Sequence, residues 1–285
     1  MPLKTFKTLD GVPVHYARPP AGEYGTRGKS YPFKCTDAFL KLLEGFFKEL
    51  HQVCWLKRPE VITSAGAKVE KPGYHGSGDA FDIDAVFWED FDFVTLDFPK
   101  LPVFYLGFES ILRRHFGTVL NYLYNPAHED HFHIDSGSAV GFSRASRSRI
   151  LYLQAVSKYV FNIPVKVDGK WGPETLNAVD QVKALLAKNY DINTKKGWTD
   201  LLFDIANYAF ALTESERSTS DDPIPVVGEV AASKLNIRSS PDLSGEKVAQ
   251  PLKEGSKVEI LEKSGEWYKV ETSIQGWVHS KYIKG

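Results

Sequence analysis

The chain has 285 residues, and its 35 lysines and arginines against 36 aspartates and glutamates give a net charge of -1. One typical domain holds about 100–150 residues, so we expect two or three domains. The balanced charge argues against a protein built mainly to bind nucleic acid. No apolar run approaches the ~20 residues that span a bilayer, so no membrane partner is expected, and no signal peptide is visible.

Residues 1–140 mix helical and strand patterns, which predicts an α+β domain. Apolar residues recur at helical spacing from Phe39 to Leu50, so we expect a helix over 37–51 with Asp37 as its N-cap. The other expected elements are strands around 53–64, 80–86 and 130–135 and a helix near 108–116.

Two further domains are expected after a weak seam near 136–148. Residues 145–213 carry three apolar stripes at helical spacing and predict a small all-α three-helix bundle. The polar, acidic segment 214–230 contains two prolines and predicts an extended linker. Residues 231–285 show short strands between Gly, Ser and Pro turns and predict a small all-β barrel.

Histidines gather in one short segment near the end of the first domain. Residues two apart on a strand point the same way, so His131, His133 and Asp135 are expected on one face. Phe132 and Ile134 would then face the core. Three imidazoles this close contribute little to packing, which favours a functional reason for them.

A second cluster places His75 before a glycine-containing loop and Asp82 on the strand 80–86. With His133 these residues supply two imidazoles and one carboxylate. This set suits Zn²⁺, which in catalytic sites takes three protein ligands and keeps one position for water. Asp130 and His131 are the candidates for the base that takes the proton of that water.

Simpler interpretations exist for each of these residues alone. A histidine beside a carboxylate is usually a hydrogen-bonded surface pair, and an HxH motif occurs by chance in many proteins. The combination of two separated clusters favours a metal site. The histidines expected to be structural or superficial are His15, His51, His115 and His279. Cys35 and Cys54 cannot make a disulfide framework, and whether they pair is left open.

The spacing of His75 and Asp82, followed by His131-Phe132-His133, resembles the zinc peptidases that cut peptidoglycan peptides. These are the D-alanyl-D-alanine carboxypeptidases and endopeptidases with an HxxxxxxD…HxH signature, and residues 62–66 and 128–135 especially resemble the extensin-like branch. The resemblance implies that His75, Asp82 and His133 bind zinc.

The same resemblance implies roles for the neighbouring residues. Asp130 stands where many members carry the acidic base, and in other members the residue matching His131 assists the water. His128 matches a further active-site histidine of some endopeptidases, and it is grouped with Asp84 and Asp135 as residues that contact substrate or support the ligands. The chain departs from the family in having Gly73 where serine is frequent, and aspartate rather than glutamate as the acidic base.

The remaining domains resemble modules that bind bacterial cell walls. The stretch Asp168-Gly169-Lys170-Trp171-Gly172-Pro173 resembles the core of the three-helix peptidoglycan-binding domain, although such a stretch also serves as a bare structural turn. Residues 235–241 and 265–283 resemble a bacterial SH3-type domain. We expect Trp267 and Trp277 to be core residues. Aromatic residues that are exposed on this domain would instead contact the wall.

The expected function is therefore that of a zinc-dependent peptidoglycan peptidase that acts outside the cytoplasm. One alternative is a cell-wall-binding adaptor whose metal site is structural or vestigial, because structural zinc sites are normally closed by four protein ligands. A second alternative is a peptidoglycan amidase. The sequence leaves open the scissile bond, the oligomeric state and the export route.

Overall fold

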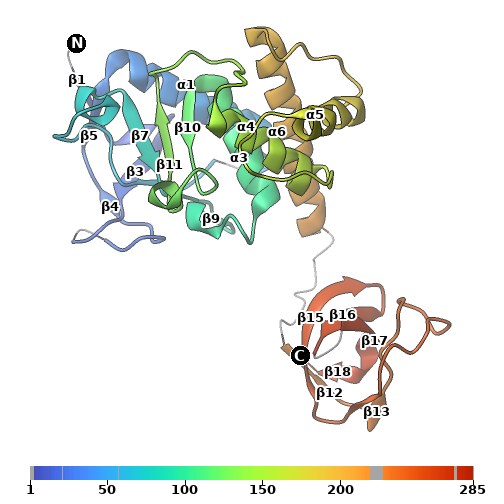
Figure 1. The fold of residues 1–285 in the computed structure, drawn as a ribbon. Helices are drawn as coiled ribbons and strands as arrows, with labels where there is room; N and C mark the ends of the chain where they lie inside the picture. The colour runs from blue at the N-terminus through green and yellow to red at the C-terminus, as the bar shows by residue number, and fades with distance from the viewer. Residues whose placement is uncertain (1–2, 21, 57, 219–226, 273–274, 285) are drawn as a thin grey trace. The chain divides into compact units, whose positions relative to one another are not determined.

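The computed structural model describes residues 3–20, 22–56, 58–218, 227–272 and 275–284. The chain forms two compact units, Met1–Ser215 and Glu216–Gly285, both visible in Figure 1. The first unit mixes helices and sheets, and the second is a curled β-sheet. Among the described residues, no helix has the length and apolar character needed to cross a bilayer.

The strands described in the first unit form three sheets. A six-stranded sheet has the order β2-β3-β6-β8-β9 with β4 paired to β3, a three-stranded sheet has the order β10-β11-β7, and β1 pairs with β5. The bounds are Leu3–Phe6 (β1), Thr8–Leu9 (β2), Val12–Tyr16 (β3), Lys29–Ser30 (β4), Phe33–Thr36 (β5), Val61–Ser64 (β6), Ala80–Ile83 (β7), Ala85–Phe87 (β8), Asp92–Val94 (β9), Thr118–Leu120 (β10) and Phe132–Asp135 (β11).

Helices α1 (Asp37–Val53) and α3 (Pro102–His115) bring aromatic residues to the core of this unit. The Phe108 ring of α3 lies 5.3 Å from Phe46 of α1 and 5.7 Å from Phe132 of β11, measured between ring centroids. These contacts fix β11 against the helices, with its other face free for the polar side chains described below.

The beginning of α1 differs from the expectation. Asp37 is the first helical residue, and the N-cap is Thr36, whose side-chain oxygen accepts a hydrogen bond from the Phe39 amide at 3.2 Å. The helix also continues to Val53, so the prediction that a strand begins at residue 53 is wrong. Strand β6 covers only Val61–Ser64. Helix α3 begins at Pro102, earlier than expected, because proline suits a first helical turn.

The predicted bundle region contains α4 (Arg147–Ala155), continued by a π-helical turn over Val156–Val160, then α5 (Pro173–Leu185) and α6 (Lys195–Ser218). These helices share one hydrophobic core with the preceding α+β region. For example, the Phe210 ring of α6 lies 5.3 Å from Phe104 of α3. The predicted linker at 214–230 overlaps the end of α6, and its residues 219–226 lie outside the described residues.

A buried ion pair lies where α3 meets α4. Glu109 is fully buried, and Arg113 Nε donates to its carboxylate at 2.7 Å. Asn121 Nδ2 donates to the other carboxylate oxygen at 2.7 Å, and Arg113 also donates to Ser148 Oγ at 2.8 Å. This network joins α3 to α4 through Ser148 and to Asn121, the residue after β10. Each buried polar group in it depends on the others for a partner.

The motif that resembles a peptidoglycan-binding core forms a turn that is held by the side chain of Gln154. The Gln154 side chain of α4 accepts from the Asp168 and Gly169 amides at 3.0 and 2.8 Å and donates to Thr175 Oγ1 at 2.9 Å. Gly169 has a φ of +72°, a conformation that a side chain disfavours. The motif therefore has a structural role in joining α4 to α5, whatever it binds.

The second unit contains a five-stranded sheet of order β17-β16-β15-β12-β18 and the pair β13-β14. The strands are β12 (Val227–Val230), β13 (Lys234–Leu235), β14 (Leu252–Lys253), β15 (Lys257–Ser264), β16 (Trp267–Glu271), β17 (Gln275–His279) and β18 (Ile283–Lys284). Its core is small and aliphatic, with Val258, Val270 and Val278 among its members.

Trp267 differs from its favoured interpretation as a core residue. It is half-buried, lies outside the core cluster, and packs against His279 in a tilted arrangement with 5.4 Å between ring centroids. Tyr282 lies 5.9 Å from His279 and is 38% exposed. These three rings form an aromatic strip on the surface of the second unit. The side chain of Trp277 lies outside the described residues.

Candidate metal centre

Two adjacent strands bring Asp82 and His133 together. Strands β7 and β11 are antiparallel, and their register places Asp82 directly opposite His133. Phe132 and Ile134 are fully buried on the other face, which confirms the predicted phase of β11. Side chains at directly opposed positions lie on the same face of a sheet, so the carboxylate and the imidazole meet there.

His75 reaches the same point from α2 (Tyr74–Ser77), a single helical turn between two glycines. Gly73 and Gly78 have φ values of 92° and 84°, which glycine adopts at little cost. Gly76 lies so close to the Lys71 carbonyl that a Cβ would sit 1.9 Å from that oxygen. The backbone at these three positions therefore favours glycine for steric reasons, and the resulting turn buries the His75 side chain.

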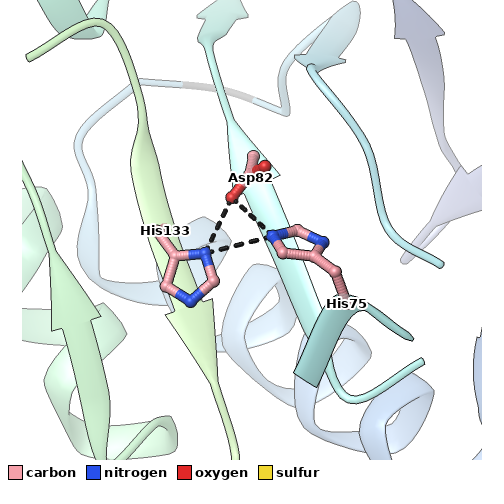
Figure 2. Close-up of side chains that lie close together, drawn as sticks. All are labelled: His75, Asp82 and His133. Carbon is pink, nitrogen blue, oxygen red and sulfur yellow. Dashed lines mark hydrogen bonds and ion pairs between the residues drawn. The ribbon is translucent and has the colours of Figure 1, made fainter. Parts of the chain in front are cut away.

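Figure 2 shows the three side chains converging on one point. His75 Nε2 lies 3.1 Å from Asp82 Oδ1 and 3.1 Å from His133 Nδ1, and His133 Nδ1 lies 3.0 Å from Asp82 Oδ1. We call these three residues the triad. Its three facing atoms form a nearly equilateral triangle.

The outer nitrogen of each histidine is held by an acceptor. His75 Nδ1 donates to the Ala67 carbonyl at 2.6 Å, and His133 Nε2 donates to Asp135 Oδ2 at 3.2 Å. Since a carbonyl or carboxylate oxygen can only accept, the protons stay on these outer nitrogens. When no proton lies between them, the inner nitrogens of His75 and His133 present lone pairs to each other and to a carboxylate oxygen.

Three electron-pair donors at this spacing fit a small cation. A tetrahedral zinc ion with bonds of about 2.0–2.1 Å places neighbouring ligand atoms about 3.3 Å apart, close to the sides of the triangle. Two imidazoles and one carboxylate form a frequent zinc ligand set, and bonds from the outer nitrogens to a carbonyl and a carboxylate orient such ligands. The residues present therefore fit the implied zinc ion.

The ionisation of the triad follows from the same contacts. Burial would raise the pKa of Asp82, but hydrogen bonds from His133 and His75 outweigh it and hold that pKa well below its usual range. Burial would lower the pKa of His133, but Asp135 and Asp82 outweigh it and raise the pKa to about 9. A proton thus occupies the triangle when no metal does.

His131 points one nitrogen toward the triad and the other away from it. Its Nε2 lies 3.7 Å from Asp82 Oδ1, and its Nδ1 donates to Asp130 Oδ1 at 2.7 Å. Asp130 Oδ2 accepts from Arg18 Nη1 at 2.6 Å. Burial opposes the ionisation of Asp130, but the bonds from Arg18 and His131 outweigh it and lower its pKa.

Arg18 was missed in the sequence analysis. Its Nε and Nη2 donate to the two oxygens of Asp84, each at 2.9 Å, in addition to the bond with Asp130. Asp84 is fully buried two residues after Asp82, so it requires a cationic partner. No local pattern marks Arg18, because it follows β3 and lies far from both carboxylates in sequence. A buried aspartate beside a ligand is a signal that such a cation exists.

His128 lies beside the triad without touching its centre. Its ring centroid is 5.3 Å from that of His131 and 5.7 Å from that of His133. Its Nδ1 is bonded to Asn125 Oδ1 at 2.7 Å. Burial and the charges of His131 and His133 lower the pKa of His128 to about 4, so it is neutral around pH 7.

The other histidines lie in local pairs, as expected for structural or surface residues. The contacts are His15 with the Arg27 carbonyl, His51 with Asp10, His115 with Glu49 and His279 with Glu266. Cys35 and Cys54 are both buried and free, so they do not form a disulfide in this structure.

Residues 233–284 match the family model described as bacterial SH3 domain. This agrees with the predicted SH3-type domain and with the curled sheet of the second unit. Bacterial SH3 domains often bind cell walls, which is consistent with a cell-wall-associated protein. Searches of curated proteins and of solved structures gave no match. The comparisons contain no zinc peptidase family, so the resemblance of the first domain stays a prediction.

Proposed function

We propose that this protein is a zinc-dependent hydrolase that cuts a peptide bond in peptidoglycan. The observation that carries the proposal is the triad, three donors within 3.1 Å of one another whose outer nitrogens are fixed by Ala67 and Asp135. A bound zinc ion would supply Lewis-acid polarisation of a carbonyl and activation of a water.

His131 is the better candidate for the base. Its Nδ1–H is committed to Asp130, so Nε2, the nitrogen nearer Asp82, is the one that accepts and returns a proton. Both oxygens of Asp130 are already engaged, one by His131 and one by Arg18. Asp130 therefore holds the His131 ring in position rather than taking the proton itself.

Neutral His128 adds a further polar group at the rim. Its Nδ1 is bonded to Asn125, so Nε2 is the atom left to hydrogen-bond a substrate amide or carbonyl. Three protein ligands with His131 and His128 nearby differ from a structural zinc site, which four protein ligands normally close. This arrangement supports catalysis over a purely structural metal site.

The second unit supports peptidoglycan as the target. A bacterial SH3 domain at 233–284 would anchor the chain to the wall, with the aromatic strip of Trp267, His279 and Tyr282 as its contact surface. Anchoring makes each encounter of the first unit with wall peptides effectively intramolecular and raises the local substrate concentration. The protein would then act outside the cytoplasm.

The test combines metal analysis with digestion of purified cell-wall sacculi. His133→Ala is expected to abolish both zinc binding and fragment release, whereas the control His15→Gln, at a surface pair, leaves both intact. Mass spectrometry of the released fragments should find cut peptide bonds. Fragment release by His133→Ala at the wild-type rate would overturn the proposal, and release of intact stem peptides would identify an amidase instead. Zinc binding without any fragment release would favour a wall-binding adaptor.

A further inference from the structure

A pocket of 470 Å³ lies against the segment of chain whose backbone also supports the triad. Residues 65–70, which follow β6, form one wall of this pocket. The same segment positions two triad residues, because the Gly66 carbonyl accepts from the Asp82 amide at 3.0 Å and the Ala67 carbonyl accepts from His75. A molecule in the pocket would therefore contact the segment that supports the triad, and the residues that line the pocket include none of the triad itself.

The opposite wall is aromatic. Tyr16, at the end of β3, and Tyr31 both line the pocket, with 5.5 Å between their ring centroids. Tyr31 is 47% exposed and packs edge-on against Phe33 at 4.9 Å. Two adjoining phenol rings offer an apolar surface with polar tips, a combination that suits the aliphatic part of an amino-acid residue. The volume is within the range of about 300–1,000 Å³ that is typical of small-ligand pockets.

Two lysines line the same pocket from paired segments of backbone. The Lys68 amide donates to the Lys34 carbonyl at 3.0 Å, which places the two residues side by side. The Lys68 side chain is only 19% exposed, and its ammonium lies 2.7 Å from the Glu70 carboxylate, whose side chain is 95% exposed. An ion pair with so exposed a partner is weak, so a ligand carboxylate can replace Glu70. With one acid against two lysines, the pocket carries an excess of positive charge.

We propose that this pocket binds a carboxylate-bearing residue of the peptide substrate. Lys34 and Lys68 take the carboxylate, and the tyrosines contact the aliphatic part of the residue. This inference rests on the proposed function, because it assigns the substrate residue that positions the peptide at the triad. It predicts a preference for acidic peptides that the triad alone would not provide.

The test measures binding separately from cleavage. Calorimetric titration uses the full chain carrying His133→Ala, with the peptide Ala-Glu-Lys-Ala-Ala, its glutamine counterpart, and inorganic phosphate as probes. The pocket variant is Lys34→Met with Lys68→Met. The matched control is Lys41→Met, since Lys41 is 77% exposed on α1 and pairs with Asp37 outside the pocket. Thermal melting checks that each variant folds, and Tyr31→Leu provides a second pocket variant that keeps both charges.

We expect the glutamate peptide to bind about tenfold more weakly, or worse, to the lysine variant, because charged hydrogen bonds are lost. The glutamine peptide should bind the chain with an intact pocket as weakly as the glutamate peptide binds the lysine variant. Lys41→Met should not change the affinity for the glutamate peptide. The pocket proposal would be overturned if the glutamate peptide bound the lysine variant, the control variant and the chain with an intact pocket with equal affinity. It would also be overturned if phosphate competed as well as the peptide. If binding depends on the pocket but wild-type protein cuts no wall peptide, only the proposed hydrolase function fails. If the protein cuts peptides and the lysine variant keeps the wild-type KM, only the pocket proposal fails.

Discussion

The proton in the triad predicts an unusual pH dependence of stability in metal-free protein. The pKa of His133 is raised from 6.5 in the unfolded chain to about 9 in the fold, where Asp135 and Asp82 bond to the ring. A raised folded-state pKa contributes stability that is fully present below pH 6.5 and is lost as the pH rises through 9. Metal-free protein should therefore become less stable on the alkaline side of neutrality.

The magnitude follows from the two pKa values. Between pH 6.5 and 8.5 the linkage relation gives a loss of about 2 kcal/mol in the free energy of unfolding for a single group of this kind. His133 is largely buried, with 15% of its side chain exposed, so solvent screening removes little of this effect. The buried thiols Cys35 and Cys54, whose pKa values are raised to about 12, add a further loss mainly above pH 9.

Urea unfolding of chelator-treated protein at pH 6.5, 7.5 and 8.5 would measure this loss. His133→Gln cannot titrate and should show no such decline, whatever its absolute stability. With saturating zinc, the decline should disappear, because metal replaces the proton and binds more tightly as the pH rises. A flat response in the metal-free wild type, or the same slope in His133→Gln, would refute the assignment of the proton to the triad.

Three further predictions concern other parts of the chain. Arg113→Met should destabilise the first unit by about 3–5 kcal/mol in urea unfolding, because it leaves the buried Glu109 charge unpaired. Adding Glu109→Gln to this variant should recover much of the lost stability. Equal stability of the single and double variants would contradict this prediction. Arg18→Ala should lower kcat for wall-peptide cleavage about 10–100-fold while zinc content is retained, and Arg18→Lys should not restore it, since lysine cannot pair with Asp84 in a bidentate manner. Trp267→Ala should reduce co-sedimentation with cell walls, whereas Leu261→Ala, at an exposed position of the second unit, should not. Equal retention of the two variants would exclude the aromatic strip as the wall contact.

Local spacing was sufficient to predict the face on which the β11 side chains lie. The alternation of Phe132 and Ile134 with His131, His133 and Asp135 fixes the phase of a strand, and burial of the two apolar residues follows from it. The position of Asp82 opposite His133 depends on the pairing register of two strands about fifty residues apart. No local pattern encodes that register, so it required the structure.

The remaining differences have the same kind of origin. Thr36 and Asp37 are both good capping residues, and the choice between them depends on the backbone of β5, which leaves Thr36 extended with its hydroxyl free to accept from Phe39. Arg18 was missed because its partners, Asp84 and Asp130, are brought to it by tertiary folding alone. Sequence periodicity reports which side of an element is buried, but it does not report which polar groups from distant elements meet there.

Charge balance around the triad gives a reason for a cation that is independent of family resemblance. Four carboxylates surround the site, those of Asp82, Asp84, Asp130 and Asp135, and three of them are less than a tenth exposed. Arg18 supplies one positive charge against these four, and a proton on His133 supplies a second. Buried carboxylates are tolerated when opposite charge compensates them, and the metal-free site still has two uncompensated. A divalent ion that displaces the His133 proton would leave only one negative charge uncompensated. The surrounding charges therefore favour replacement of the proton by the ion, even though the proton is firmly held.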